Sequence, residues 1–166
     1  MSSTVDGALL LTSELVDFLS SPVSIKAGSC SQDLTPSVTH VRGCRIDRAR
    51  GEICIFVSQS HSAAVLQDLR GGGALSVVFS RPSTHRTVQF KASTVYIEDL
   101  APGDQELITR HGLRVAGELI SLGYNPAFSH ALMAPDVSDA VCVRFKPLAA
   151  FDQTPGAGAG NPLGVC

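Results

Sequence analysis

A polar, cationic segment at residues 81–92 carries the residue types best suited to binding a small anion. It contains Arg81 and Arg86 among three hydroxyl side chains, and it runs into a stretch of alternating apolar and polar residues. Arginine donates paired hydrogen bonds to phosphate oxygens, and a strand entrance adds backbone donors. The alternation predicts a strand with Gln89 on its polar face. Any one of these cations alone would be interpreted as a solvated charge, but their concentration beside hydroxyls favours a site for a phosphorylated cofactor.

Two other polar runs could contribute to such a site. The run from Ser58 to Ser62 joins an apolar strand to a predicted helix, so its backbone amides could meet a phosphate. Its serines could equally cap the helix. His40 and Arg42 are two residues apart on a predicted strand and therefore share one face. There they would contact a cofactor ring or phosphate, or lie in solvent.

Composition indicates one globular domain. The 166 residues include 44% hydrophobic and 17% charged residues, and the net charge of -2 gives no electrostatic basis for binding nucleic acid or a membrane surface. The N-terminus lacks the features of a signal peptide, so we expect a cytoplasmic protein. The five cysteines form no Cys-x-x-Cys pair and the five histidines share no metal-ligand spacing, so we expect free thiols and no metal site.

The pattern of apolar residues predicts a mainly β, α+β chain: a six-stranded antiparallel barrel with flanking helices. Helices are predicted at residues 12–20, 62–70 and 102–122, with a short one capped by Asn125, and strands at 23–27, 37–46, 52–58, 74–79, 87–98 and 140–145. The barrel domain would span residues 1–152. The Gly/Pro-rich tail at 153–166 would be mobile or would order against a partner. Its glycine run has no helix after it, which argues against a dinucleotide-binding loop.

The order of these elements and several local patterns resemble the pyridoxamine 5′-phosphate oxidase-like superfamily of flavin-binding split barrels. The resemblance covers most of the chain, up to Phe151. It is carried by the helix at Leu15–Leu19, the dipeptide Pro36-Ser37, the run Gly51–Ser58 and the strand Arg86–Ala92.

The resemblance implies a homodimer with FMN in two clefts at the subunit interface. The strand segment along the isoalloxazine would be Thr39, His40, Val41 and Arg42. The turn near the phosphate would be Ser58, Gln59, Ser60, His61 and Ser62, with Arg86, Thr87 and Gln89 close by. The chain departs from the family pattern where the usual phosphate-binding arginine and lysine fall near Thr39 and Cys44. The missing charge would come from His40, Arg42, Arg81 or Arg86.

Three functional hypotheses follow from these residues and the resemblance. The first is an FMN-dependent oxidoreductase acting on a small molecule, in which the cofactor carries the chemistry. The chain has no tryptophan and lacks the family's substrate-holding tail, so it is not expected to be a true pyridoxamine 5′-phosphate oxidase. The second is a non-catalytic module that binds flavin or heme, with His40 or His61 as the axial ligand. The third is a barrel that has lost its cofactor.

Overall fold

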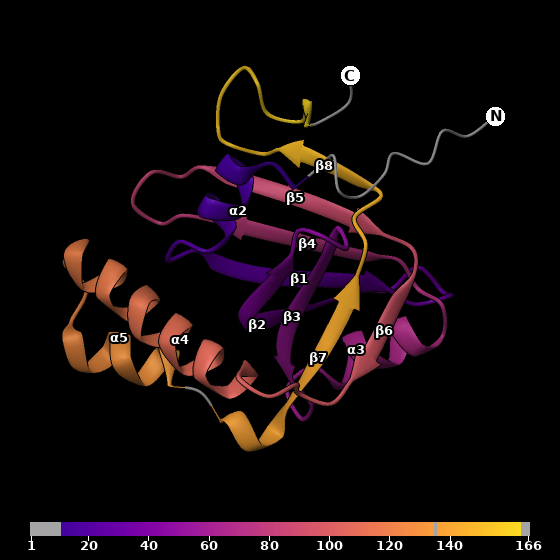
Figure 1. Cartoon of the computed structure of the whole chain (residues 1–166), viewed down its shortest axis with the longest axis horizontal. Coiled ribbons are helices and arrows are strands. Elements are labelled where there is room, and N and C mark those ends of the chain that lie inside the picture. Colours follow the sequence, from indigo (N-terminus) through magenta and orange to yellow (C-terminus); the bar gives the residue numbers. More distant parts are fainter. Residues whose placement is uncertain (1–10, 135, 164–166) are drawn as a thin grey trace.

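The computed structural model describes residues 11–134 and 136–163 as one antiparallel sheet with flanking helices (Figure 1). The sheet has the strand order β6-β7-β3-β2-β1-β4-β5-β8-β9. The helices are α2 (Ser13–Leu19), α3 (Ala63–Arg70), α4 (Asp104–Ser121), α5 (Pro126–Met133) and the 3-10 turn η1 (Val137–Asp139). The strands are β1 (Ser24–Cys30), β2 (Pro36–Asp47), β3 (Glu52–Ser58), β4 (Leu75–Ser80), β5 (Thr87–Ala92), β6 (Val95–Glu98), β7 (Ala140–Phe145), β8 (Ala149–Asp152) and β9 (Pro162–Leu163). The predicted antiparallel sheet with flanking helices is confirmed.

The predicted strand at residues 87–98 is two strands. Its first part, β5, pairs with β4, whereas its second part, β6, pairs with β7 at the far end of the strand order. Only Ser93 and Thr94 separate them, and so short a link spans about 11 Å at most. The sheet must therefore curl until these two regions approach. In Figure 1, β1, β4 and β5 accordingly run across the view while β3, β7 and β6 run up it.

The core lies on the inner face of the curled sheet. Alternate residues of β1, β4 and β5 are buried there, including Ile25, Val77 and Phe90. Helix α2 adds Leu15 and Phe18 to the same cluster. In β1, β4 and β5 every second side chain therefore points outward, where it is available to a ligand, whereas every residue of β3 is buried.

Strand β2 bends where it passes α4. Its pairing with β3 shifts register between Val41 and Cys44, around Gly43. The φ angle of Gly43 is 149°, and a Cβ there would lie 3.3 Å from the Cβ of His111 in α4. Glycine therefore allows both the bulge and the close approach of the helix.

Helices α4 and α5 form an antiparallel hairpin outside the sheet, and Figure 1 shows it extending away from the strands. Two ion pairs attach α4: Arg45 of β2 binds the buried Asp104 at 2.8 Å, and Arg81 binds Glu118 at 3.1 Å. Within residues 11–134 and 136–163, no helix combines the length and apolar character required to cross a membrane.

The described part of the tail folds against its own chain. Strand β8 pairs with β5, and Pro162–Leu163 add a ninth strand beside β8. The Thr154 hydroxyl accepts a hydrogen bond from the Thr87 amide at 3.0 Å. The glycine and proline content of the tail did not predict these strand pairings. Such content indicates turns, but it does not show which segments between the turns pair with the sheet.

Candidate functional site

A pocket of about 400 Å³ lies between the outer face of the sheet and the α4–α5 hairpin. Its floor consists of Ser24, Lys26, His40 and Arg42 on β1 and β2. Its other walls are apolar and consist of Pro82, Val115, Leu119, Leu132 and Met133. No acidic side chain lines it. The volume falls within the range of small-molecule sites, and this lining suits a flat apolar body with a negatively charged group.

Lys26 and His40 are cross-strand neighbours and form the centre of the floor. They are paired in the register of β1 and β2, and the Nζ of Lys26 lies 2.6 Å from the Nδ1 of His40. Burial, followed by the charges of Lys26 and Arg42, lowers the pKa of His40 to about 4. His40 is therefore neutral at physiological pH and accepts at Nδ1 from the Lys26 ammonium, which leaves the ring proton on Nε2.

Arg42 completes a cationic floor. Among the residues that the structure describes, neither Arg42 nor Lys26 has a carboxylate within ion-pair distance. Burial, and next the charge of Arg42, lowers the pKa of Lys26. Two uncompensated positive charges at one end of an apolar pocket would be stabilised by an anion.

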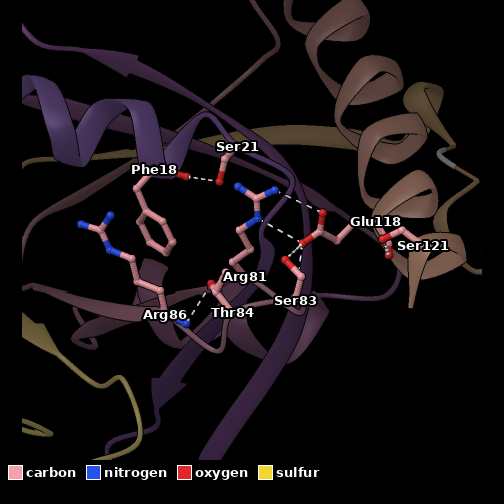
Figure 2. A network of polar contacts seen from close by, with 8 residues as sticks. All are labelled: Phe18, Ser21, Arg81, Ser83, Thr84, Arg86, Glu118 and Ser121. Atoms are coloured by element: carbon pink, nitrogen blue, oxygen red, sulfur yellow. Dashed lines mark hydrogen bonds and ion pairs between the residues drawn. The ribbon is translucent and has the colours of Figure 1, made fainter. Parts of the chain in front are cut away.

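Arg81, predicted to bind a phosphate, forms an ion pair with α4, which carries part of the pocket's apolar wall. Its guanidinium donates to both carboxylate oxygens of Glu118 on α4, at 3.1 and 3.4 Å (Figure 2). The backbone amide of Ser83 donates to the same carboxylate at 3.3 Å. The hydrogen bond from Arg81 is the main cause that lowers the pKa of Glu118. Arg81 therefore connects the β4–β5 loop to α4.

The other predicted residues of this segment also have partners within the chain. Arg86 lies over the ring of Phe18, 4.6 Å from its centroid, and pairs with Glu14 at 2.9 Å; Figure 2 shows it beside that ring and apart from Arg81. Thr87 donates to the backbone of the β4–β5 loop, and Gln89 donates to Ser76 at 2.8 Å. A role of these three residues toward a phosphate stays a prediction.

The turn from Ser58 to Ser62 is closed by Asp139. The Ser58 hydroxyl donates to the Asp139 carboxylate, and Ser60 donates to it from its hydroxyl at 2.7 Å and its amide at 3.2 Å. The Gln59 amide donates to the Asp139 carbonyl at 2.8 Å. The hydrogen bonds from the two serines lower the pKa of Asp139, which keeps it ionised. A carboxylate from η1 thus receives the donors that a phosphate would need.

The remaining residues of the turn and of the β2 segment point elsewhere. Ser62 does not cap α3 with its side chain; its hydroxyl lies 2.7 Å from that of Thr39 in a buried contact. Val41 lies in the core, which leaves only its backbone for a ligand. The Nδ1 of the exposed His61 lies 3.3 Å from the Ser58 hydroxyl. The structure therefore brings His40 and Arg42 into the pocket and places the turn in a separate network.

Sequence reasoning missed Lys26, Asp139 and the apolar roof. Lys26 lies in the strand predicted at residues 23–27, but nothing local indicated that His40 would be its cross-strand neighbour. Asp139 contacts a turn about 80 positions earlier in the chain. These associations depend on strand pairing and packing, which local patterns do not specify.

The largest of the cavities described suits an anionic ligand less well than this pocket. This cavity, about 610 Å³ in volume, lies between residues 30–34 and the glycine-rich end of α3. It contains Asp33 and Asp68 and no cationic side chain. Within residues 11–134 and 136–163, no group of three or more His, Cys, Asp or Glu side chains has an arrangement suited to a metal ion.

No protein-family model matches the chain, and no curated protein matches it significantly in sequence. Several solved structures match it in shape. HupZ of Group A Streptococcus is 13% identical with a TM-score of 0.54, over 90% of this chain and 99% of its own. A pyridoxamine 5′-phosphate oxidase candidate from Lactobacillus delbrueckii is 11% identical with a TM-score of 0.52, over 86% and 94%.

An F420 reductase is 16% identical with a TM-score of 0.51, over 81% of this chain and 93% of its own. At such identities the likeness concerns the fold. The resemblance drawn from the sequence motifs is thereby confirmed at that level: this chain has the fold of the pyridoxamine 5′-phosphate oxidase-like split-barrel proteins.

Proposed function

We propose that this chain binds a flavin, with FMN as the first candidate, and serves as an oxidoreductase toward a small molecule. The observation that carries the proposal is the pocket under the α4–α5 hairpin, which combines a cationic floor with an apolar roof. A flavin is a planar ring system with polar edges and, in FMN, a phosphate.

The residues of the pocket divide into two groups by chemistry. Lys26, His40 and Arg42 would hold the anionic and hydrogen-bonding parts of the cofactor, and Val115 and Leu119 would pack against its ring. Once bound, the flavin would supply the electron or hydride transfer, so the protein need provide only binding, orientation and control of access. The names of two structural neighbours, an F420 reductase and an oxidase candidate, are compatible with redox chemistry on this fold.

A second copy of the chain is part of this proposal. The α5 side chains Phe128 and Leu132 are 53% and 52% exposed, and Leu132 also lines the pocket. Val38, on the outer face of β2, is 74% exposed. Pairing of two subunits across these surfaces would cover apolar area and close the open side of the pocket. We also propose that six of the strands form a split barrel around the core. The proposed location of the protein is the cytoplasm.

The contact between Lys26 and His40 favours flavin over heme at this pocket. A histidine binds heme iron through a ring nitrogen that carries no proton, and the opposite nitrogen then acts as a donor. Here Nδ1 lies 2.6 Å from the Lys26 ammonium and acts as the acceptor, so the proton lies on Nε2. Iron ligation through Nε2 would require His40 to give up this contact or Lys26 to lose its proton, which makes the pair less suited to heme.

The absorbance spectrum of freshly purified protein tests the proposal. We expect flavin bands, or their appearance when FMN is added to the apoprotein, together with turnover when an electron donor and a panel of small-molecule acceptors are supplied. A Soret band without flavin would favour the heme-binding hypothesis. If neither chromophore is present and FMN does not bind at micromolar concentration, the proposed function is wrong.

A further inference from the structure

The family's usual phosphate-binding cations are absent from this chain, and four residues were candidates to replace them. The structure separates these four into two pairs. Arg81 and Arg86 face the carboxylates of Glu118 and Glu14, so their charges are already compensated. His40 and Arg42 lie in the pocket floor beside Lys26 and face no carboxylate among the described residues.

The turn from Ser58 to Ser62 is also an unfavourable place for a phosphate. The amides of Gln59 and Ser60 and the hydroxyls of Ser58 and Ser60 all donate to Asp139. A phosphate placed there would have to displace an ionised carboxylate or lie beside it, and like charges in contact repel. The chain's own carboxylate therefore occupies the anion position of this turn.

The pocket floor has the opposite electrostatic character. Lys26 and Arg42 are close enough that the charge of the arginine contributes to lowering the pKa of the lysine. The repulsion between them is relieved when an anion binds, since a dianionic phosphate can accept hydrogen bonds from both. His40 adds a third donor, because its Nδ1 is taken by Lys26 and its proton lies on Nε2. The groups facing His40 are Lys26 and Arg42 on the strands and His111 on α4.

We propose that Lys26 and Arg42, with His40 as a neutral hydrogen-bond donor, form a phosphate-binding site for a phosphorylated aromatic cofactor, and that Asp139 excludes the phosphate from the turn at Ser58–Ser62. This inference rests on the proposed flavin function, but it adds Lys26 as a binding residue and moves the anion from the helix-preceding turn to the β1–β2 floor. The apolar roof of α4 and α5 then faces the aromatic part of the same ligand.

The experiment compares FMN with riboflavin, which differ only by the phosphate. Flavin fluorescence titration of the wild type should give an FMN affinity about tenfold to a hundredfold above that of riboflavin, as expected for charge-assisted contacts. Lys26→Met and Arg42→Met keep the apolar stems but remove the charges, and each should weaken FMN binding about tenfold more than it weakens riboflavin binding. Arg50→Ala removes a charge from a 75% exposed side chain outside the pocket and serves as the matched control.

Two competing variants make the test decisive. If Arg86→Ala or Ser60→Ala abolishes the preference for FMN while Arg42→Met does not, the phosphate binds at the originally predicted position and the inference is wrong, although flavin binding stands. Equal affinities of FMN and riboflavin for the wild type would also overturn it.

Phenyl phosphate provides a probe that does not depend on flavin. It should shift the NMR signals of the His40 ring in the wild type but not in Arg42→Met. If this shift occurs in a protein that binds no flavin, the proposed function fails while the anion site stands. If phenyl phosphate leaves the His40 signals unchanged, the anion site is excluded.

Discussion

His111 should make this protein unusually sensitive to mild acid. The side chain lies on α4 against Gly43, and its Nε2 is buried without a hydrogen-bond partner among the described residues. Burial is the main cause that lowers the pKa of His111 to about 4, from an ordinary value of 6.5. Between about pH 4 and 6.5, the His111 ring is therefore neutral in the folded protein but protonated in the unfolded chain.

The sign of the effect follows from proton uptake. Between pH 6.5 and 4 the unfolded state binds more protons than the folded state, so the free energy of unfolding falls as the pH falls. Above pH 6.5 His111 is neutral in both states, and it does not lower the free energy of unfolding there. At about pH 5, the lowered pKa of His111 corresponds to a loss of about 2 kcal/mol. His40 has a similarly lowered pKa but is more accessible to solvent, so we expect about 1 kcal/mol from it.

The assay is urea denaturation at a series of pH values from 7.5 to 5. The wild type should lose about 3 kcal/mol across this range, and His111→Leu should lose only about 1 kcal/mol because the buried titrating group is gone. The carboxylates with lowered pKa values have ordinary values of 3.8 to 4.5 and titrate below the range. His130→Ala, which changes an exposed histidine on α5, is the control and should behave as the wild type. Identical pH dependence in the wild type and His111→Leu would refute the reasoning.

Three further predictions concern the framework around the pocket. Asp104→Ala should cost about 3 kcal/mol in urea denaturation, because it leaves the Arg45 guanidinium without the fully buried carboxylate that it contacts at 2.8 Å; Asp47→Ala, at a partly exposed carboxylate, should cost less than about 1 kcal/mol, and equal losses would contradict this account. Gly43→Ala should destabilise by about 2 kcal/mol and weaken flavin binding, since its Cβ would press on His111 and straighten the bulge in β2; an alanine variant as stable as wild type would show that the bulge tolerates a side chain. Sedimentation should give twice the 17.4 kDa chain mass, and a monomer that still binds FMN at micromolar concentration would exclude a site completed by the second subunit.

Most helices and strands of this fold could be predicted from the sequence. The helix predicted at residues 102–122 is α4 (Asp104–Ser121), and Asn125 caps α5 by accepting from the Phe128 amide at 3.1 Å, as predicted. These features depend on local periodicity and capping, which a single sequence displays directly. The break at Ser93–Thr94 was missed although the apolar positions change phase there, from Val88 and Phe90 to Val95 and Ile97. This change also fits one strand that passes from solvent into the core, and strand pairing shows that the two halves are separate strands.

Only part of the candidate site could be predicted from the sequence. His40 and Arg42 were placed on one face by their spacing, and the structure confirms that they share the pocket floor. The roles of Arg81 and Asp139 were not accessible, because each is determined by a partner far away in sequence: Glu118 for the arginine and the turn serines for the aspartate. A charged residue type indicates what a side chain can bind, whereas packing determines whether the chain itself has already supplied the partner.

The most direct test of the central claim is a crystal structure of the protein with FMN bound. The account predicts the flavin between the sheet and the α4–α5 hairpin, with its phosphate in contact with Lys26 and Arg42 and its ring against Val115 and Leu119. A phosphate bound at the turn beside Asp139, or a flavin in any other cavity, would contradict it.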